Sequence, residues 1–227
     1  VRGALAVAEG ARDCVGGLIV PAVSAMEAAQ ITGVAVFGAT DLQQVVGILR
    51  GEDAGAELPV TRPRMSRPDG PDLSDVRGQR GTVAALQIAA AGGHSILLTG
   101  PPGTGKTMLA RRLPALLPAL SDTEAIEVTR IHSIAGLHSG DELVRDRPFR
   151  APHHTISASG LVGGGSVPAP GEVTLAHLGV LFLDELAEFS RPALEALRQP
   201  LEDGRVAIVR GQASAVYPTL TTLVGST

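Results

Sequence analysis

The chain has 227 residues, of which 44% are hydrophobic and only 2% aromatic, and its formal net charge is −4. This length allows one large domain or two smaller ones, with a core built mainly from aliphatic side chains. The acidic balance argues against a uniformly basic protein that coats nucleic acid, although a local basic lining in an oligomer's pore stays open. The single Cys14 excludes an internal disulfide framework and fits a reducing cytoplasm. No apolar run approaches a membrane span and no signal peptide is visible, and because the chain begins with Val1 we expect its natural N-terminus to be missing.

The first part of the chain alternates between helix-like and strand-like segments. The apolar pattern predicts helices over 4–13, 24–31 and 40–51 and short buried strands over 16–21 and 33–38. Ser24 and Thr40 stand where helix N-caps are expected, and Gly51 stands where the third helix ends. This α/β pattern is too short for a complete domain.

Residues 51–72 have the composition of a linker, with four prolines and many charges. Arg62, Arg64 and Arg67 form a basic cluster there. Contact with phosphate is one interpretation of this cluster, but a solvated linker is favoured.

A second α/β pattern begins at Leu73. It predicts a helix-rich start at 75–93, a strand at 95–100, helices at 106–113, 121–131 and 191–204, a buried strand at 179–185 and a hairpin at 204–218. Ser121 is expected to cap its helix, with Glu124 three positions later completing a capping box. Pro192 suits the first turn of the last helix.

Residues 100–107 fit the phosphate-loop pattern G-x-x-x-x-G-K-[ST] between a strand and a helix. Glycines let backbone N–H groups turn inward around phosphate oxygens, and the helix N-terminus adds a favourable dipole. Lys106, the only lysine in the chain, would place a compact ammonium at the β- and γ-phosphates, where arginine's planar head does not fit. Thr107 offers a hydroxyl to Mg²⁺. The predicted ATP site therefore comprises Gly100, Pro101, Pro102, Gly103, Thr104, Gly105, Lys106, Thr107 and Met108.

The apolar run Gly179–Leu183 ends in Asp184 and Glu185. A strand ending in acids is weak evidence alone, but paired with a phosphate loop it predicts the second half of a nucleotide site. Asp184 is expected to hold Mg²⁺ through water, and Glu185 to polarise the attacking water. The predicted catalytic residues are thus Glu185 and Lys106.

Several segments of residues 73–227 together resemble one family. They are "GHSILLTGPPGTGKTMLARRLPALLP", "IHSIAGLHSG", "RPFRAPHHTISASGLVGGG", "PGEVTLAHLGVLFLDELAEF" and "LEALRQPLEDGRVAIVRG". The chain resembles the magnesium-chelatase-like ComM/YifB family of bacterial AAA+ ATPases. The resemblance implies a P-loop three-layer α/β/α core with inserted hairpins, preceded by part of a Lon-protease-like α/β domain. It also implies that "DVRGQ" lies beside the adenine, although Arg77 stands where a small apolar residue is more usual.

The resemblance implies three regions. Residues 1–50 resemble the end of the Lon-like domain, 51–72 form the linker, and 73–227 form the AAA+ domain, cut before its first sensor and its lid. True Lon proteases carry a catalytic lysine near the start of the first segment, but no lysine precedes Lys106 here. A Ser–Lys protease dyad therefore cannot be built, and we interpret this region as a structural or partner-binding piece.

The glycine-rich segment 149–177 lies between the two nucleotide motifs and contains His153, His154 and His177. Its spacing is poor for a zinc site, and no cysteine or acid pattern supports one. The resemblance implies an insertion into a ring's pore, where Arg150, His153 and His154 would contact DNA. The alternative is a loop that packs on a neighbouring subunit.

Arg198 follows the Asp-Glu strand by one helix. It would contact a nucleotide in a neighbouring subunit or, as is more usual, lie on a helix surface. Segment 202–218 resembles the hairpin inserted before the family's first sensor strand. The final "LVGST" departs from the family's usual apolar "LVAA" run.

These features favour an ATP-hydrolysing ring motor in the cytoplasm, for which the family implies a hexamer and DNA helicase or branch-migration activity in natural transformation. One alternative is the motor subunit of a magnesium chelatase, although the Lon-like segment disfavours it. Another is a nucleotide-binding fragment without turnover, because the family's γ-phosphate-sensing asparagine would follow Thr227. We expect the 227-residue piece to hydrolyse ATP very slowly and the full-length protein to be a competent ATPase.

Overall fold

The computed structural model describes residues 3–53, 56–57, 71–138, 142–165, 168–210 and 213–227. The chain divides into two compact units. The first comprises Val1–Met65 with Ala125–Val144, and the second comprises Ser66–Glu124 with Arg145–Thr227. Residues 125–144 thus group with the N-terminal part of the chain. The sequence analysis placed this segment in the AAA+ domain, 73–227, so its expected domain limits differ from these two units, and they stay a prediction.

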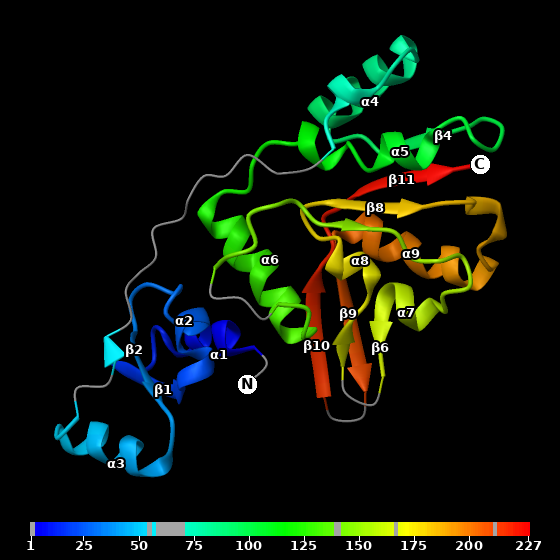
Figure 1. Ribbon diagram of the computed structural model, residues 1–227. Coiled ribbons are helices and arrows are strands. Elements are labelled where there is room, and N and C mark those ends of the chain that lie inside the picture. The colour runs from blue at the N-terminus through cyan, green and yellow to red at the C-terminus, as the bar shows by residue number, and fades with distance from the viewer. Residues whose placement is uncertain (1–2, 54–55, 58–70, 139–141, 166–167, 211–212) are drawn as a thin grey trace. The chain divides into compact units, whose positions relative to one another are not determined.

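The first unit has a three-stranded sheet in the order β1-β2-β3, accompanied by helices (Figure 1). Its elements are α1 (Ala4–Ala11), β1 (Gly17–Pro21), α2 (Ala22–Ala28), β2 (Ala35–Ala39), α3 (Leu42–Arg50) and β3 (Ala56–Glu57). Strands β1 and β2 are parallel, and β3 runs antiparallel to β2. Small side chains dominate the core, which lets the helices lie close to the sheet: Ala4, Leu5, Ala8, Val20, Ala25, Ala28 and Ile31.

Two predicted caps of the first unit were wrong. Helix α3 is capped by Asp41, whose Oδ1 accepts the N–H of Gln44 at 2.8 Å, and not by Thr40. Asp41 and Thr40 are both good capping types, so the sequence alone does not separate them. Ser24 lies buried inside α2, which begins at Ala22.

Helix α6 (Asp122–Ile134) contributes to the first unit from Ala125 onward. Arg130 pairs with Glu9 at 2.5 Å, and the Ser133 hydroxyl donates to the Glu27 carboxylate at 2.5 Å. These polar contacts join segments that are distant in sequence, and they explain why this part of α6 groups with the N-terminal residues.

The predicted capping box at the start of α6 is confirmed. The Ser121 N–H donates to Glu124 Oε2 at 2.8 Å, and the Glu124 N–H donates to Ser121 Oγ at 3.3 Å. The hydrogen bond from the Ser121 N–H also holds the pKa of Glu124 below its usual range.

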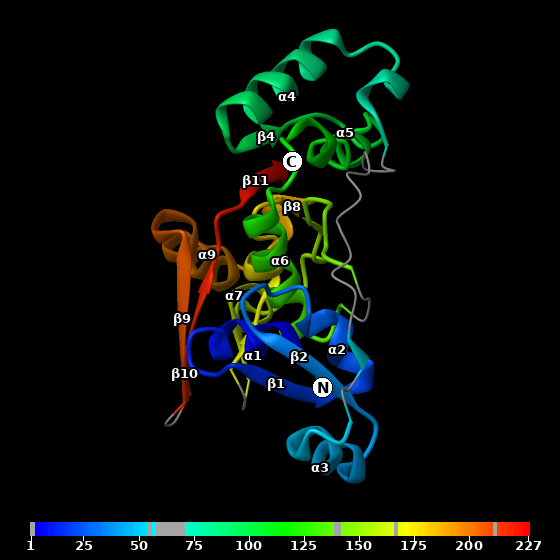
Figure 2. The same ribbon diagram turned by 90° about the vertical axis from the view of Figure 1, so that its left-hand side faces the viewer.

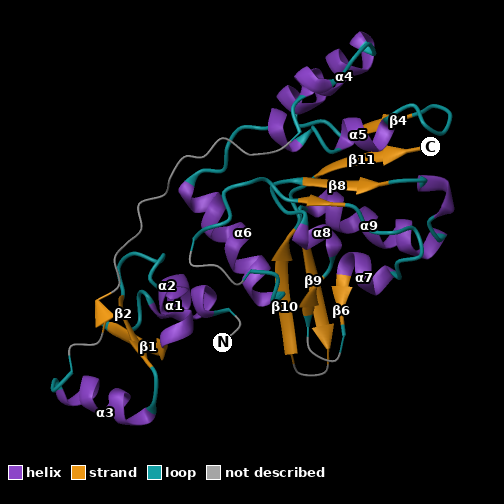
Figure 3. Ribbon diagram, in the orientation of Figure 1, coloured by secondary structure: helices purple, strands orange, loops and turns teal. Residues whose placement is uncertain are grey.

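The second unit contains the phosphate loop and the Asp-Glu strand (Figures 1 and 3). Its helical elements, besides the start of α6, are η1 (Leu73–Asp75), α4 (Arg80–Gly92), α5 (Lys106–Ala110), η2 (Pro114–Leu116), α7 (Ala158–Val162), α8 (Glu172–Leu175), η3 (Leu186–Glu188) and α9 (Arg191–Asp203). Its strands are β4 (Ile96–Leu98), β5 (Phe149–Arg150), β6 (Gly163–Gly164), β7 (Ala169–Pro170), β8 (Val180–Leu183), β9 (Arg205–Arg210), β10 (Ala213–Pro218) and β11 (Thr222–Ser226).

The central sheet of this unit has the order β4-β11-β8-β5, and every pairing in it is parallel. All four residues of β8 are buried, as expected for a strand covered on both faces. Val180 and Phe182 pack with α4 and α5, whereas Leu181 and Leu183 pack with α7, α8 and α9. Figure 2 shows these two helical layers in a second view. The predicted three-layer α/β/α core is confirmed.

Two small ribbons accompany the sheet. Strands β6 and β7 pair antiparallel, and β9 and β10 form the predicted hairpin. Val206, Ile208 and Tyr217 are buried on one side of this hairpin, whereas Val209 and Val216 are exposed. Within the described ranges, no helix is both long and apolar enough to cross a bilayer.

Candidate nucleotide site

The phosphate loop connects β4 to α5. Gly103 and Gly105 have φ values of 79° and 83°, in the left-handed region that glycine adopts without strain. A Cβ added at Gly103 would meet nothing within 4 Å, so the space beside the loop is open there. Helix α5 begins at Lys106, and its N-terminus therefore follows the loop directly. This is the local arrangement that binds phosphate.

The Lys106 ammonium lies against the loop itself. Its Nζ donates to the carbonyl oxygens of Gly100 at 2.6 Å and Pro101 at 3.2 Å. The Thr104 hydroxyl donates to the same Pro101 carbonyl at 2.9 Å. The positive charge is thus already held inside the loop, and a phosphate would compete with these carbonyls for it.

Thr107 and Asp184 meet across two different elements. The Thr107 hydroxyl donates to Asp184 Oδ2 at 2.7 Å, and Ser226 donates to Oδ1. Burial raises the pKa of Asp184, but its neighbours outweigh burial and hold that pKa below its usual range. These neighbours are Ser226, Thr107, the N–H of Glu185 and the charge of Lys106. The carboxylate is therefore ionised, and with the hydroxyl it offers the oxygen ligands that Mg²⁺ prefers.

Glu185 follows in a left-handed conformation, with a φ of 54°. A non-glycine residue there is strained, and such strain tends to cluster at functional sites. Its carboxylate is 67% exposed and approaches His154, with Nδ1 and Oε2 3.3 Å apart. The His154 ring lies 4.1 Å from the His153 ring and meets Phe189 edge-on at 6.5 Å. The segment expected to contact DNA thus carries a residue that contacts the predicted catalytic glutamate.

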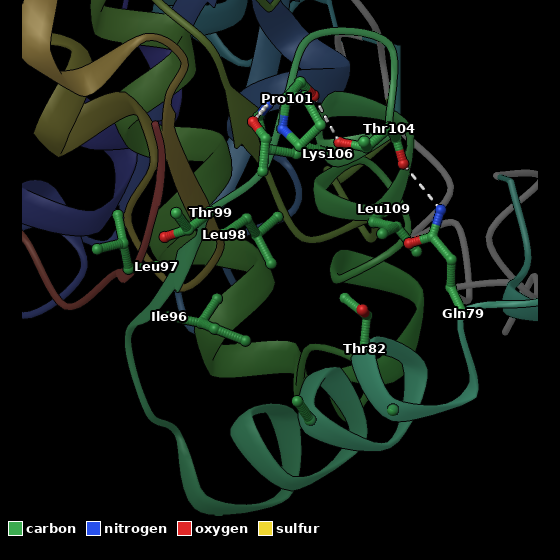
Figure 4. A pocket seen from close by; sticks show the side chains of 13 residues that line it. Gln79, Thr82, Ile96, Leu97, Leu98, Thr99, Pro101, Thr104, Lys106 and Leu109 are labelled. Atoms are coloured by element: carbon green, nitrogen blue, oxygen red, sulfur yellow. Dashed lines mark hydrogen bonds between the residues drawn. The ribbon is translucent and has the colours of Figure 1, made fainter.

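A pocket of about 440 Å³ opens beside the loop (Figure 4). In Figure 4, Ile96, Leu97 and Leu98 of β4 lie on one side, and Thr82 lies opposite. Four predicted loop residues also line this pocket: Gly100, Pro101, Thr104 and Lys106. Its apolar wall and adjoining phosphate loop suit the base and the phosphates of a nucleotide.

Gln79 connects this pocket to the loop. Its side-chain Nε2 donates to the Thr104 carbonyl at 2.8 Å, and its backbone is left-handed, with a φ of 51°. Arg77, from the same "DVRGQ" segment, lines a separate pocket with Leu73 and Val76. The segment therefore borders the candidate base pocket through Gln79.

The remaining predicted residues lie elsewhere. Arg150 makes a bidentate pair with Glu172, at 2.6 and 2.7 Å, and the hydrogen bonds to Glu172 raise the pKa of Arg150. Arg198 is 80% exposed and pairs with Glu202 on the surface of α9 at 2.9 Å. Their expected contacts with DNA or a neighbouring subunit stay predictions.

The three histidines of segment 149–177 do not form one group, because His153 and His154 lie together whereas His177 has different neighbours. His177 is buried and accepts the Leu220 N–H through Nδ1 at 3.1 Å, whereas His153 contacts Thr155 at 3.0 Å. In the part of the chain that the structure describes, no three His, Cys, Asp or Glu side chains are grouped as metal ligands are.

Two contacts of this site were not predicted. The Ser226 hydroxyl lies against Asp184 and Glu185, and Gln79 holds the loop. In the sequence, Ser226 differs from the others only because the run "LVGST" departs from the expected "LVAA". Gln79 belongs to the segment "DVRGQ" that is expected beside the adenine, but nothing in that segment marks it as a residue that holds the loop.

The fold and the site together define a P-loop nucleotide-binding protein. A glycine loop with its lysine follows one strand, and an aspartate paired with the loop's threonine follows another strand of the same α/β/α sheet. The family model described as "Magnesium chelatase, subunit ChlI" matches residues 72–227. The chain therefore belongs to this family of AAA+ proteins, whose fold is that of an ATPase.

Relatives support the same assignment over nearly the whole chain. An uncharacterised protein of Mycobacterium tuberculosis (strain H37Rv) is 51% identical over 99% of this chain and 45% of its own length. The protein YifB of Escherichia coli K12 is 48% identical, over 88% of this chain and 39% of its own. The competence protein ComM of Haemophilus influenzae is 44% identical, over 92% and 42%. The chain thus spans less than half the length of these relatives.

A solved structure has the same fold. It is a complex between the BchI and BchD subunits of magnesium chelatase, and it aligns with a TM-score of 0.52 at 25% identity, over 67% of this chain and 53% of that one.

Proposed function

We propose that this chain is part of an ATP-hydrolysing AAA+ motor that assembles with copies of itself into a ring, a hexamer by family resemblance, and acts on DNA in the cytoplasm. The observation that carries ATP hydrolysis is the 2.7 Å contact between Thr107 and Asp184, because it joins the phosphate loop to the acid strand. The family and the site support nucleotide binding. DNA as the substrate is supported by one relative's name, a competence protein, and by the family resemblance.

The residues present fit an ATP–Mg²⁺ complex. The loop N–H groups and Lys106 would bind the phosphates, while Thr107 and Asp184 would hold Mg²⁺. When bound, Mg²⁺ neutralises charge that develops on the transferred phosphoryl group. Glu185 would accept a proton from, and orient, the attacking water, since its side chain is exposed and it directly follows Asp184, which contacts the loop's Thr107.

His154 bears on the same step. It contacts the carboxylate that would act as the base, and it belongs to the segment expected to contact DNA. Movement of that segment would change the surroundings of Glu185, which offers a physical route by which DNA binding would alter the hydrolysis rate. Within the chain, this route uses the 3.3 Å contact between His154 and Glu185.

The test is the ATPase rate of the full-length protein with and without branched DNA. We expect DNA to stimulate turnover, and we expect Glu185→Gln to bind ATP while losing hydrolysis. A Glu185→Gln variant that hydrolyses ATP normally would overturn the assigned base.

A magnesium chelatase motor subunit is the second candidate, favoured by the matched family and by the solved chelatase complex. A DNA-independent ATPase rate together with no binding of forked DNA would support this candidate over the first.

A further inference from the structure

Ser226 ends β11 and is only 1% exposed. Its hydroxyl donates to Asp184 Oδ1, and its oxygen accepts the backbone N–H of Glu185 at 3.2 Å. One buried hydroxyl therefore contacts both acids that follow β8. Ser226 therefore contacts both the residue expected to hold Mg²⁺, Asp184, and the residue expected to activate water, Glu185.

The backbone fixes where this hydroxyl lies. Strand β11 runs between β4 and β8, with Ser226 paired to Leu98 on one side and Gly225 paired to Leu183 on the other. Thr227 continues the ladder, since its N–H donates to the Leu98 carbonyl at 3.0 Å. Ser226 is thus held by hydrogen-bonded strands on both sides, between the strand that leads into the phosphate loop and the strand that leads into the acids.

The two oxygens of Asp184 have different neighbours. Oδ2 accepts from Thr107 at 2.7 Å, while Oδ1 accepts from Ser226 and from the Glu185 N–H at 3.1 Å. Thr107 is the hydroxyl expected to bind Mg²⁺. Oδ2 therefore faces the expected metal position, and Oδ1 is anchored by the protein. Hydrogen bonds of this kind orient ligating carboxylates and tune metal affinity.

We propose that Ser226 is a positioning residue for the magnesium site: it holds the Asp184 carboxylate with one oxygen towards Thr107 and supports the left-handed backbone of Glu185. This inference rests on the proposed function, because it requires nucleotide and Mg²⁺ at this site. The chain anchors its aspartate by a contact that a methyl group cannot make. Alanine is consequently a conservative replacement for testing the hydroxyl.

The experiment measures binding of a non-hydrolysable fluorescent ATP analogue to the full-length protein, in EDTA and across a Mg²⁺ series. Ser226→Ala is expected to raise the Mg²⁺ concentration for half-maximal binding about tenfold, the lower end of effects seen when partners of metal ligands are removed. Affinity in EDTA should not change. Ser226→Cys, which keeps the shape but hydrogen-bonds weakly, should lie between alanine and wild type.

Thr221→Val is the matched control, because it also removes a hydroxyl beside β11. That hydroxyl donates to the Gly179 carbonyl at 3.2 Å, away from the two acids, so the variant should keep the wild-type Mg²⁺ midpoint. Thermal unfolding of each variant shows whether it is folded.

An unchanged Mg²⁺ midpoint in folded Ser226→Ala or Ser226→Cys would overturn the inference about Ser226 and leave the proposed function standing. So would an equal loss of affinity in EDTA and in Mg²⁺, because Ser226 would then act on the loop in general. Wild-type protein that binds no nucleotide in either buffer would instead overturn the proposed function, and this inference with it.

Discussion

Replacing Lys106 by alanine separates the energetics of nucleotide binding from those of folding. The ammonium makes two hydrogen bonds to loop carbonyls, at 2.6 and 3.2 Å. A bound phosphate would accept a hydrogen bond from the ammonium in place of these carbonyls. A hydrogen bond to a charged group contributes about 1.5 to 3 kcal/mol net. Since about 1.4 kcal/mol corresponds to tenfold in affinity, Lys106→Ala should weaken ATP binding by roughly 10- to 150-fold.

The same change should affect stability little. The hydrogen bonds of Lys106 go to carbonyl groups of a solvent-accessible loop, where water can replace the ammonium, and its charge acts on Asp184, which keeps its hydrogen bonds from Thr107 and Ser226. Surface substitutions of this kind usually change the free energy of unfolding by less than about 0.5 kcal/mol. The expected fall in the melting temperature is therefore under about 2 °C, because about 1 kcal/mol shifts a chain of this size by only a few degrees.

Titration of a fluorescent ATP analogue and thermal unfolding of the full-length protein measure the two quantities. Lys106→Arg is the matched control: it keeps the charge but brings a planar head, so its affinity should also fall while its stability stays near wild type. Wild-type affinity in Lys106→Ala would refute the role of the ammonium. A large loss of stability would refute the view that the lysine is held mainly for the ligand.

Three further substitutions test the fold and one expected contact. Phe182→Ala empties a fully buried position of β8 and should cost about 3 to 5 kcal/mol in urea unfolding, with a loss below 1 kcal/mol contradicting its place in the core. Gly179→Ala would drive a Cβ into the Pro148 carbonyl, so we expect a loss of about 1 to 3 kcal/mol by the same assay, and wild-type stability would contradict the close approach of these segments. Arg198→Ala breaks only an exposed pair with Glu202, so stability should change by less than about 0.5 kcal/mol and ATPase turnover should not change. Lower turnover at unchanged stability would show instead that Arg198 reaches a neighbouring site.

The phosphate loop, the buried acid strand and most helices could be predicted because their signals are local. A glycine-rich loop, a continuous apolar strand or a capping serine is recognisable from a few consecutive residues. Ser121 with Glu124 is an example: both partners lie within one turn of a helix. The predicted cap Thr40 was wrong because the adjacent Asp41 offers the same capping chemistry and takes that position.

The contacts that shape the site could not be predicted from local patterns. His154 reaches Glu185 because β5 and β8 are neighbours, and Ser226 reaches Asp184 because β11 lies beside β8. Strand order is a property of the whole sheet, and one sequence gives little information about it. The family resemblance implied that the glycine-rich segment contacts DNA, which stays a prediction, and the structure adds a contact of this segment with the site, between His154 and Glu185.

The sheet order also affects when the second unit can fold during its synthesis. Strands β4 and β8, which lead into the loop and the acids, are separated in the sheet by β11, whose residues follow both of them in the sequence. During synthesis, at about 5–20 residues per second, the two halves of the site therefore cannot adopt their final spacing until Thr222–Ser226 has left the ribosome. Until then both flanking strands present unpaired edges. On the proposed function, ATP would bind only chains in which β11 has paired, so nucleotide would favour those chains over chains in which the two halves of the site are still apart.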